Sequence, residues 1–114
     1  MKKERKCSQK QQEQILKANT GDLEAQYFLA NQYTKINNEN NDFIPEISFY
    51  YTNKLSQNDN NMKFQLGKMY FYGIGTDKNI YKAYEIFTEL QKINKNFNNI
   101  DEYIEKCMFI IQSR

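Results

Sequence analysis

The chain repeats its own pattern at an offset of about 37 residues, and this repetition constrains the fold more than any other feature of the sequence. The segment AQYFLANQY at 25–33 matches MKFQLGKMY at 62–70, and the offset continues without a gap through the loop and the segment that follow. The matched pairs are Leu29 with Leu66, Ala30 with Gly67, Tyr33 with Tyr70, Asp42 with Asn79, Phe49 with Ile86 and Tyr50 with Phe87, and in a weaker third copy Leu66 with Tyr103 and Tyr70 with Cys107. Each unit has the pattern of a helix, a loop and a helix. Because one such pair cannot bury its own apolar face, we expect neighbouring units to stack.

Few residues in the chain break helices, since it has one proline and four glycines among 114 residues. Apolar side chains recur at helical spacing, and no two short segments with strand alternation are joined by a hairpin turn. The sequence therefore predicts an all-α protein, a short α-solenoid of about six antiparallel helices. The predicted helices span 8–19, 23–35, 45–55, 61–72, 80–93 and 100–113. In one domain, residues 1–21 would form an N-terminal cap helix, 22–58 the first repeat, 59–95 the second, and 96–114 a C-terminal cap helix.

Capping residues indicate where several of these helices begin. Ser8, Asp22, Asp42 and Asn79 are expected N-caps, because a short polar side chain can accept a hydrogen bond from an amide of the first turn. Pro45 is expected in the first turn of its helix, where the missing N–H of proline is tolerated.

Two glycines separated by one residue, Gly73 and Gly75, raise the alternative of a phosphate-binding loop. Such a loop needs a longer glycine pattern, or glycine followed by Lys and Ser or Thr, placed after a strand. Here GIGTDK follows a predicted helix and has neither pattern. We therefore interpret these glycines as the turn between two helices, where they allow φ > 0.

The residue types that are missing limit the chemistry of the chain. It has no histidine, which removes the commonest general base, the commonest metal ligand and the usual partner of a serine or cysteine nucleophile. Cys7 and Cys107 form no CxxC pattern, so we expect free thiols, without a disulfide or a zinc site. We expect no enzyme activity, no catalytic residue, no cofactor and no metal.

Charge and hydropathy narrow the partners and the location. A formal net charge of +2 argues against nucleic acid as the main partner, because phosphate binding usually needs a clear basic excess. No run of about 18 apolar residues is present, so no membrane contact is expected. The start, MKKERKCSQKQQEQ, leads into no apolar segment, so no secretory signal is predicted and a cytoplasmic location is the default expectation.

The stretch LGKMYFYGIG, followed by KNIYKAYEIF, resembles the Sel-one-like repeat, a relative of the tetratricopeptide repeat. The opening ANTGDLEAQYFLANQY resembles the junction between two such repeats, so the resemblance covers 18–87 well. The residues that match the pattern are Leu66, Gly67, Tyr70, Gly73, Gly75, Lys82, Ala83 and Phe87. The resemblance implies stacked helix pairs and a role as a protein–protein adaptor or scaffold.

Most of the repeated residues have an expected structural role. Ala30 and Gly67 would be small where two helices cross closely, and Ala83 would be small on the facing helix. The residues expected to fill the seam between paired helices are Leu29, Leu66, Tyr33 and Tyr70.

The first helix of each pair would line a concave groove if the tetratricopeptide geometry holds, and its remaining positions are the candidate site for a protein partner. Aromatic anchors concentrate binding energy in protein interfaces. The alternative for each aromatic residue is packing against its neighbours. The predicted groove residues are Tyr27, Asn31, Thr34, Lys35, Phe64, Lys68, Phe71, Tyr72, Asp101, Glu105 and Met108.

These observations predict a non-catalytic protein-binding module. Because the chain is short for a scaffold, the specific hypothesis is an immunity protein or antitoxin that binds a cognate toxin domain at 1:1 and neutralises it. A small adaptor in signalling or complex assembly is the alternative. An RNA-binding helical repeat protein is the third hypothesis, because aromatic side chains interleaved with Lys can stack on the bases of single strands.

Overall fold

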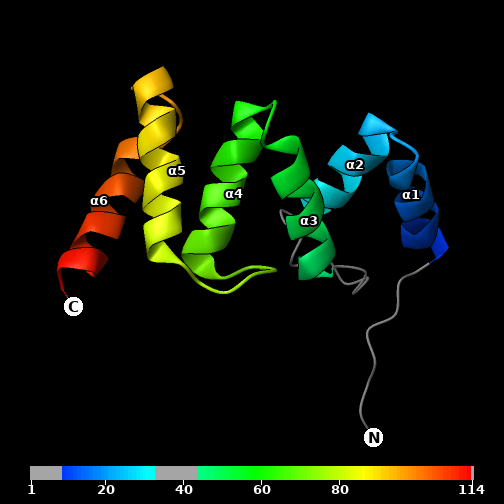
Figure 1. Ribbon diagram of the computed structural model, residues 1–114, viewed down its shortest axis with the longest axis horizontal. Helices are drawn as coiled ribbons and strands as arrows, with labels where there is room; N and C mark the ends of the chain where they lie inside the picture. Colours follow the sequence, from blue (N-terminus) through cyan, green and yellow to red (C-terminus); the bar gives the residue numbers. More distant parts are fainter. Residues whose placement is uncertain (1–8, 33–43, 114) are drawn as a thin grey trace, which may run out of the picture.

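The computed structural model describes residues 9–32 and 44–113, and within these ranges it contains six α-helices and no strand (Figure 1). The helices are α1 (Gln9–Asn19), α2 (Leu23–Ala30), α3 (Pro45–Leu55), α4 (Asn60–Tyr72), α5 (Ile80–Ile93) and α6 (Ile100–Gln112). This confirms the predicted all-α class, and five of the six predicted helices agree with the observed bounds to within one residue at each end.

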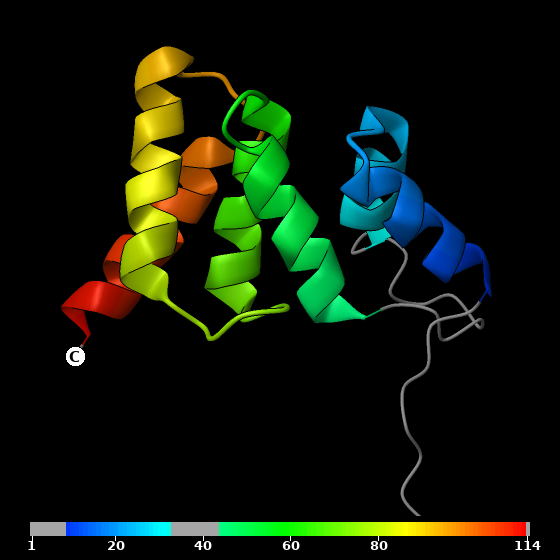
Figure 2. The same ribbon diagram turned by 45° about the vertical axis from the view of Figure 1, so that its right-hand side comes forward.

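Each helix packs antiparallel against the next helix in the sequence, so that the six form a row from α1 to α6 (Figure 1). Alternate helices also touch. The amide of Gln65 in α4 donates to the Ala30 carbonyl of α2, and the Phe64 ring of α4 contacts the Tyr103 ring of α6. In Figure 2, α6 is visible between α4 and α5, in agreement with its ring contacts to both.

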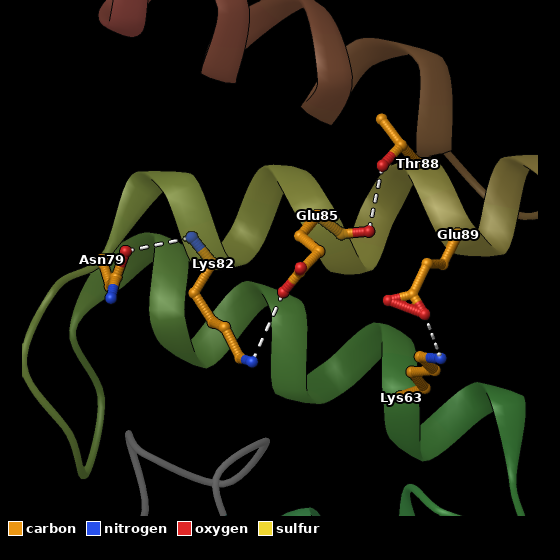
Figure 3. Close-up of polar contacts among 6 residues, drawn as sticks. All are labelled: Lys63, Asn79, Lys82, Glu85, Thr88 and Glu89. Carbon is orange, nitrogen blue, oxygen red and sulfur yellow. Dashed lines mark hydrogen bonds and ion pairs between the residues drawn. The ribbon is translucent and has the colours of Figure 1, made fainter.

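Two of the predicted N-caps are observed. The Asp22 carboxylate accepts from the Ala25 amide at 3.1 Å, and the Asn79 side chain accepts from the Lys82 amide at 3.0 Å (Figure 3). Both geometries satisfy first-turn amides that have no partner within the helix. Ser8, the third predicted cap, lies outside the described residues.

The starts of α3 and α4 add detail that the sequence interpretation did not contain. Pro45 occupies the first turn of α3 as predicted, preceded by Ile44 at the cap position, while Asp42 lies outside the described residues. Asp59 caps α4, since its Oδ1 atom accepts from the Asn61 and Met62 amides at 2.8 and 3.2 Å.

The α-helix α2 ends at Ala30 and residues 31 and 32 form a 3₁₀ turn, whereas positions 33–35 of the predicted helix lie outside the described residues. The physical reason for the end of α2 is the Ala30 carbonyl. It accepts from the Ser48 hydroxyl of α3 at 2.6 Å and from the Gln65 amide of α4 at 3.0 Å. Side chains of two other helices thus satisfy a carbonyl that a continuing helix would satisfy itself.

The buried apolar side chains form two clusters. The N-terminal cluster lies among α1, α2 and α3 and the first turn of α4, and the C-terminal cluster lies among α4, α5 and α6. The N-terminal cluster consists of Ala18, Ala25, Leu29, Ala30, Tyr51, Leu55 and Met62. The C-terminal cluster consists of Phe64, Leu66, Phe71, Ala83, Ile86, Phe87, Leu90, Ile100, Ile104 and Cys107.

The predicted seam residues lie in these clusters where the structure describes them. Leu29, Leu66 and Ala83 are buried, and Tyr70 is half-buried with its ring edge-on to Phe49 at 5.4 Å. Tyr33 lies outside the described residues.

Gly67 lies at a close helix crossing, as predicted. A Cβ atom at this position would lie 2.6 Å from the Phe87 ring of α5. Such a distance is well inside van der Waals contact, so α4 and α5 can approach this closely only where α4 has no side chain.

The GIG segment is a turn between α4 and α5, as predicted. Gly73 ends α4 in the left-handed conformation, and both Gly73 and Gly75 have φ of +73°. A Cβ atom on Gly75 would also collide with the Pro45 carbonyl oxygen and lie 2.7 Å from the Phe49 Cβ atom. Glycine at this position therefore also lets the turn approach the start of α3.

The register between the units differs from the constant offset found in the sequence. α3 and α5 begin at Pro45 and Ile80, 35 residues apart (45 to 80). Their buried positions follow the same offset: Ser48, Tyr51, Thr52 and Leu55 of α3 match Ala83, Ile86, Phe87 and Leu90 of α5. The sequence pairing of Tyr50 with Phe87 is therefore wrong, because Tyr50 is 58% exposed and Phe87 is fully buried.

The third copy is also displaced. Met62, Leu66 and Met69 of α4 are buried, and the buried residues of α6 with the same spacing are Ile100, Ile104 and Cys107, 38 residues further on (62 to 100). The sequence pairing of Leu66 with Tyr103 and of Tyr70 with Cys107 is therefore one residue short. The error matters for the site, because one residue rotates a helical position by about 100°.

Candidate protein-binding surface

The exposed stripe of α4 is narrower than the sequence predicts. Asn61 and Tyr72 are exposed and Lys68 is half-buried. Helical periodicity places these three positions on the same face of α4. Phe64 and Phe71 are each only 8% exposed, so the expectation that their rings line an open groove is wrong.

Phe64 and Phe71 pack around Tyr103 of α6 instead. Their ring centroids lie 5.7 and 5.6 Å from that of Tyr103 with nearly perpendicular ring planes, and the Phe87 ring lies 5.1 Å from it on another side. Edge-to-face ring pairs of this kind stabilise a core beyond the area that they bury. The two rings therefore form the support of the surface.

Lys68 lies on this aromatic support. Its ammonium group is 4.8 Å from the centroid of the Phe64 ring, within the range of a cation–π contact. Partial burial lowers the pKa of Lys68 below its ordinary value, because the surrounding side chains remove water from the charged group.

Tyr72 and Tyr103 bring two hydroxyl groups together. Their oxygens lie 3.3 Å apart, and either hydroxyl can be the donor. Tyr72 is 50% exposed, and its ring also contacts Phe71 edge-on at 4.9 Å. Tyr72 is thus partly exposed to solvent, while its contacts with Phe71 and Tyr103 hold its ring in place.

Tyr27 of α2 joins two helices. Its hydroxyl donates to the Oδ2 atom of Asp59 at 2.5 Å, and Asp59 caps α4 through its other oxygen. This hydrogen bond raises the pKa of Tyr27 and is the main cause that lowers the pKa of Asp59. Tyr27 is half-buried, so the predicted groove residue is also a link between α2 and α4.

The other predicted groove residues of the first unit contribute less. Asn31 is half-buried at the C-terminal end of α2, where its backbone N–H points back to the carbonyls of the helix. Thr34 and Lys35 lie outside the described residues.

On α6 the predicted groove residues lie on the side of the helix away from Tyr103. Glu105 and Met108 are exposed, but they are about 140–160° around the helix from Tyr103, which faces α4. Asp101 likewise accepts from Gln91 of α5 at 2.7 Å. The cause is the displaced register, because positions matched to α4 at an offset one residue too short point away from it.

Sequence reasoning missed Tyr103 and Lys106 as site residues. The Lys106 ammonium lies 5.3 Å from the centroid of the Tyr103 ring and 3.4 Å from the Glu102 carboxylate. The spacing of Ile100, Ile104 and Cys107 would have identified the buried face of α6 and placed Tyr103 at the edge of that face. We call Lys68, Tyr72, Tyr103 and Lys106 the α4–α6 surface.

A second polar area lies on the α4–α5 pair (Figure 3). Lys63 pairs with Glu89 at 3.2 Å, and Lys82 pairs with Glu85 at 3.4 Å. Solvent-exposed ion pairs contribute little to stability, so these residues offer matched controls for changes in the α4–α6 surface.

An apolar hollow of about 300 Å³ lies between α1 and α3, lined by Ile15, Glu46, Ile47, Tyr50 and Tyr51. It is on neither helix that carries the α4–α6 surface.

Cys107 is a free, fully buried thiol, and burial raises its pKa to about 11, so the reactive thiolate is scarce at neutral pH. Residues 9–32 and 44–113 contain no group of three or more His, Cys, Asp or Glu side chains that could hold a metal ion. None of the helices described here has the length and apolar character needed to cross a membrane. Cys7 lies outside the described residues.

Comparisons of the chain with models of protein families, with curated proteins and with solved structures found no match.

Proposed function

We propose that the chain is a non-catalytic protein-binding module, built as a short solenoid of Sel-one-like repeats. Contacts between alternate helices support the solenoid. Tyr27 of α2 bonds the Asp59 cap of α4, and Phe64 of α4 packs on Tyr103 of α6. In a stacked helix-pair array the first helices of successive pairs touch in this way.

The observation that carries the proposal is the α4–α6 surface. Tyr72 is half exposed on a base of buried rings, and aromatic side chains held in place in this way are frequent anchors of protein interfaces. A rigid anchor loses little conformational entropy on binding, which favours affinity.

The specific task that we propose is that of an immunity protein or antitoxin, which blocks a cognate toxin domain by occupying its surface at 1:1. The argument rests on the small size of the chain and on analogy between folds. A chain without histidine, whose described cysteine is buried, suits inhibition by occupation better than inhibition by chemistry.

Co-expression tests this proposal. The reading frame beside the gene is expressed with and without the protein, and the expected result is toxicity that the protein relieves together with recovery of a 1:1 complex. Equal killing with and without the protein would exclude the immunity role.

Matched variants then locate the interface. Tyr72→Ala should weaken the complex, whereas Tyr81→Ala should not, because Tyr81 is 55% exposed but lies on α5 and is not one of the four residues of the surface. Equal loss in both variants would contradict the assignment of the surface.

The two alternative functions give different results. An adaptor would be recovered with a resident enzyme or an assembly component, and the neighbouring reading frame would not be toxic. An RNA-binding protein would be retained on a polyanion column, with retention that falls steeply as salt rises.

A further inference from the structure

We propose that the α4–α6 surface recognises carboxylate side chains, so that the segment of the partner protein that docks there is acidic. This inference rests on the proposed function, because it assigns the chemistry of the partner at the same surface.

The first argument is the charge of α4. This helix contains Lys63 and Lys68 and no acidic residue. Lys63 is paired with Glu89 of α5, on the α4–α5 side. Lys68 is the lysine of α4 that lies on the α4–α6 surface, and its charge is already partly withdrawn from water above the Phe64 ring. A docking carboxylate gains Coulomb energy there while the additional desolvation of the ammonium is small.

The second argument is the pair of tyrosine hydroxyls. Tyr72 can accept the hydrogen bond from Tyr103 and turn its own proton outward, because either oxygen can be the donor. An outward phenol O–H beside an ammonium group is a set of donors that fits a carboxylate oxygen.

The third argument is the second cation. The Lys106 ammonium lies 5.3 Å from the centroid of the Tyr103 ring, and Tyr103 in turn contacts the Phe64 ring on which Lys68 lies. Glu102 is the carboxylate paired with Lys106, whereas Asp101 bonds Gln91 of α5. Glu105 points away from α4, so it does not oppose an acidic partner at this surface.

The supporting rings hold this arrangement in place. Tyr103 contacts Phe64, Phe71 and Phe87, and these three rings are buried. The donors of the surface are therefore positioned before the partner arrives, which reduces the entropy lost on binding.

The test uses an acetylated peptide of alternating glutamate and serine, with a glutamine–serine peptide as control, titrated into the labelled protein and followed by amide NMR. We expect the acidic peptide to shift the amides near Lys68, Tyr72, Tyr103 and Lys106, and the control peptide to shift none of them. The affinity should fall as salt rises, because the attraction is between charges.

Two variants and a control sharpen the test. Lys68→Met keeps the apolar stem on Phe64 and should weaken peptide binding at least about fivefold, and Tyr72→Phe keeps the ring and should weaken it about two- to tenfold. Lys82→Met removes a lysine of the α4–α5 area and should leave binding unchanged. The amide spectrum of each variant reports whether the fold is intact.

Three results would overturn the proposal. The first is that Lys68→Met and Lys82→Met weaken peptide binding equally. The second is that the peptide shifts the amides near all the lysines. The third is that an oligothymidylate of matched charge binds and that its binding depends on Lys68 to the same degree. If the Tyr72→Ala variant still abolishes capture of the partner while the peptide does not bind, the proposed function stands and only the acidic chemistry fails. If the Tyr72→Ala variant still captures the partner and the acidic peptide does not bind, both proposals fail.

Discussion

The two clusters of the molecule are stabilised by different means. In the described residues the buried polar side chains all lie at positions 11–65, in α1–α4 or at Ser56 just after α3, and none is contributed by α5 or α6. In the N-terminal cluster, Gln26 donates to the Ala18 carbonyl at 3.1 Å, and Gln65 donates to both the Ala30 carbonyl and the Thr52 hydroxyl. The C-terminal cluster instead contains a group of mutually contacting rings.

One pair of equivalent positions shows how this difference arises. Ala30 and Thr52 in the first unit correspond to Gly67 and Phe87 in the second. A large ring on α5 fits because α4 has no side chain at the crossing. In the first unit both side chains are small, and the Gln65 amide donates to the buried carbonyl of Ala30 at the end of α2. The matched positions therefore hold a ring contact between α4 and α5 and a hydrogen-bonded contact between α2, α3 and α4.

This difference also explains where the candidate site lies. Burial of large rings contributes more free energy than a neutral hydrogen bond, which adds only about 0.5–1.5 kcal/mol net. The α4–α6 surface is built on the ring cluster.

The largest expected effect is that of Phe87→Ala. Removal of a fully buried ring should lower the free energy of unfolding by about 3–5 kcal/mol, because it leaves a cavity at the crossing of α4 and α5. The equivalent change in the first unit, Thr52→Ala, should lower it by about 1–3 kcal/mol. Denaturant unfolding of the two variants measures both values. Equal losses would contradict the distinction between the clusters.

Gly67→Leu should lower the free energy of unfolding by about 1–3 kcal/mol through overpacking against Phe87. The penalty should shrink in the Phe87→Ala background, where the new side chain can enter the cavity. Thermal melts of the two single variants and the double variant measure this coupling. A penalty that is the same in both backgrounds would show that the two residues do not oppose each other.

Gln65→Leu should lower the free energy of unfolding by about 1–3 kcal/mol, because the Thr52 hydroxyl and the Ala30 carbonyl lose a buried donor. Gln91→Leu is the matched control, since its hydrogen bond to Asp101 is exposed, and it should change stability by no more than about 0.5 kcal/mol. Denaturant midpoints compare the two. If Gln91→Leu has the larger effect, the buried amide is not the main support of the N-terminal cluster.

Tyr27→Phe should have the smallest effect on stability, about 1 kcal/mol or less, because the hydrogen bond that it removes is accessible to water. Asp59 has a lowered pKa in the folded state, so its contribution is present above the unfolded value near 3.8 and is lost as pH falls through the folded value. The raised pKa of Tyr27 means that its contribution is present below the unfolded value near 10.0 and is lost as pH rises through the folded value.

The measurement for Tyr27→Phe is the free energy of unfolding of both proteins at pH 7 and pH 3. The difference between them should be larger at pH 7. A difference that does not change with pH would mean that the Tyr27 hydrogen bond does not set the pKa of Asp59.

The second unit was the most predictable part of the chain. The Asn79 cap, the GIG turn and the small residue at position 67 each have a local physical cause that a sequence displays directly. The end of α2 was not predictable, because it depends on Ser48 and Gln65, which reach the Ala30 carbonyl from other helices.

The errors in the candidate site have the same origin. The offset of about 37 residues is carried by the first helices of the units, and extending it to α3, α5 and α6 displaced the buried faces by one or two residues. Phe64 and Phe71 could not be separated from Tyr72 by residue type, since all three are aromatic. Phe64 and Phe71 are buried because they pack against Tyr103 of α6. Tyr103 is distant in the sequence, so the local residue pattern of α4 does not reveal this contact.

The most direct test of the central claim is site-specific photo-crosslinking in cells that produce the partner. A benzophenone amino acid is placed at position 72 or, as control, at position 81, which have similar exposure on α4 and α5. We predict a crosslinked protein of one defined mass from position 72 and none from position 81. Crosslinking from position 81 alone, or from neither position, would contradict the claim that the α4–α6 surface binds a protein partner.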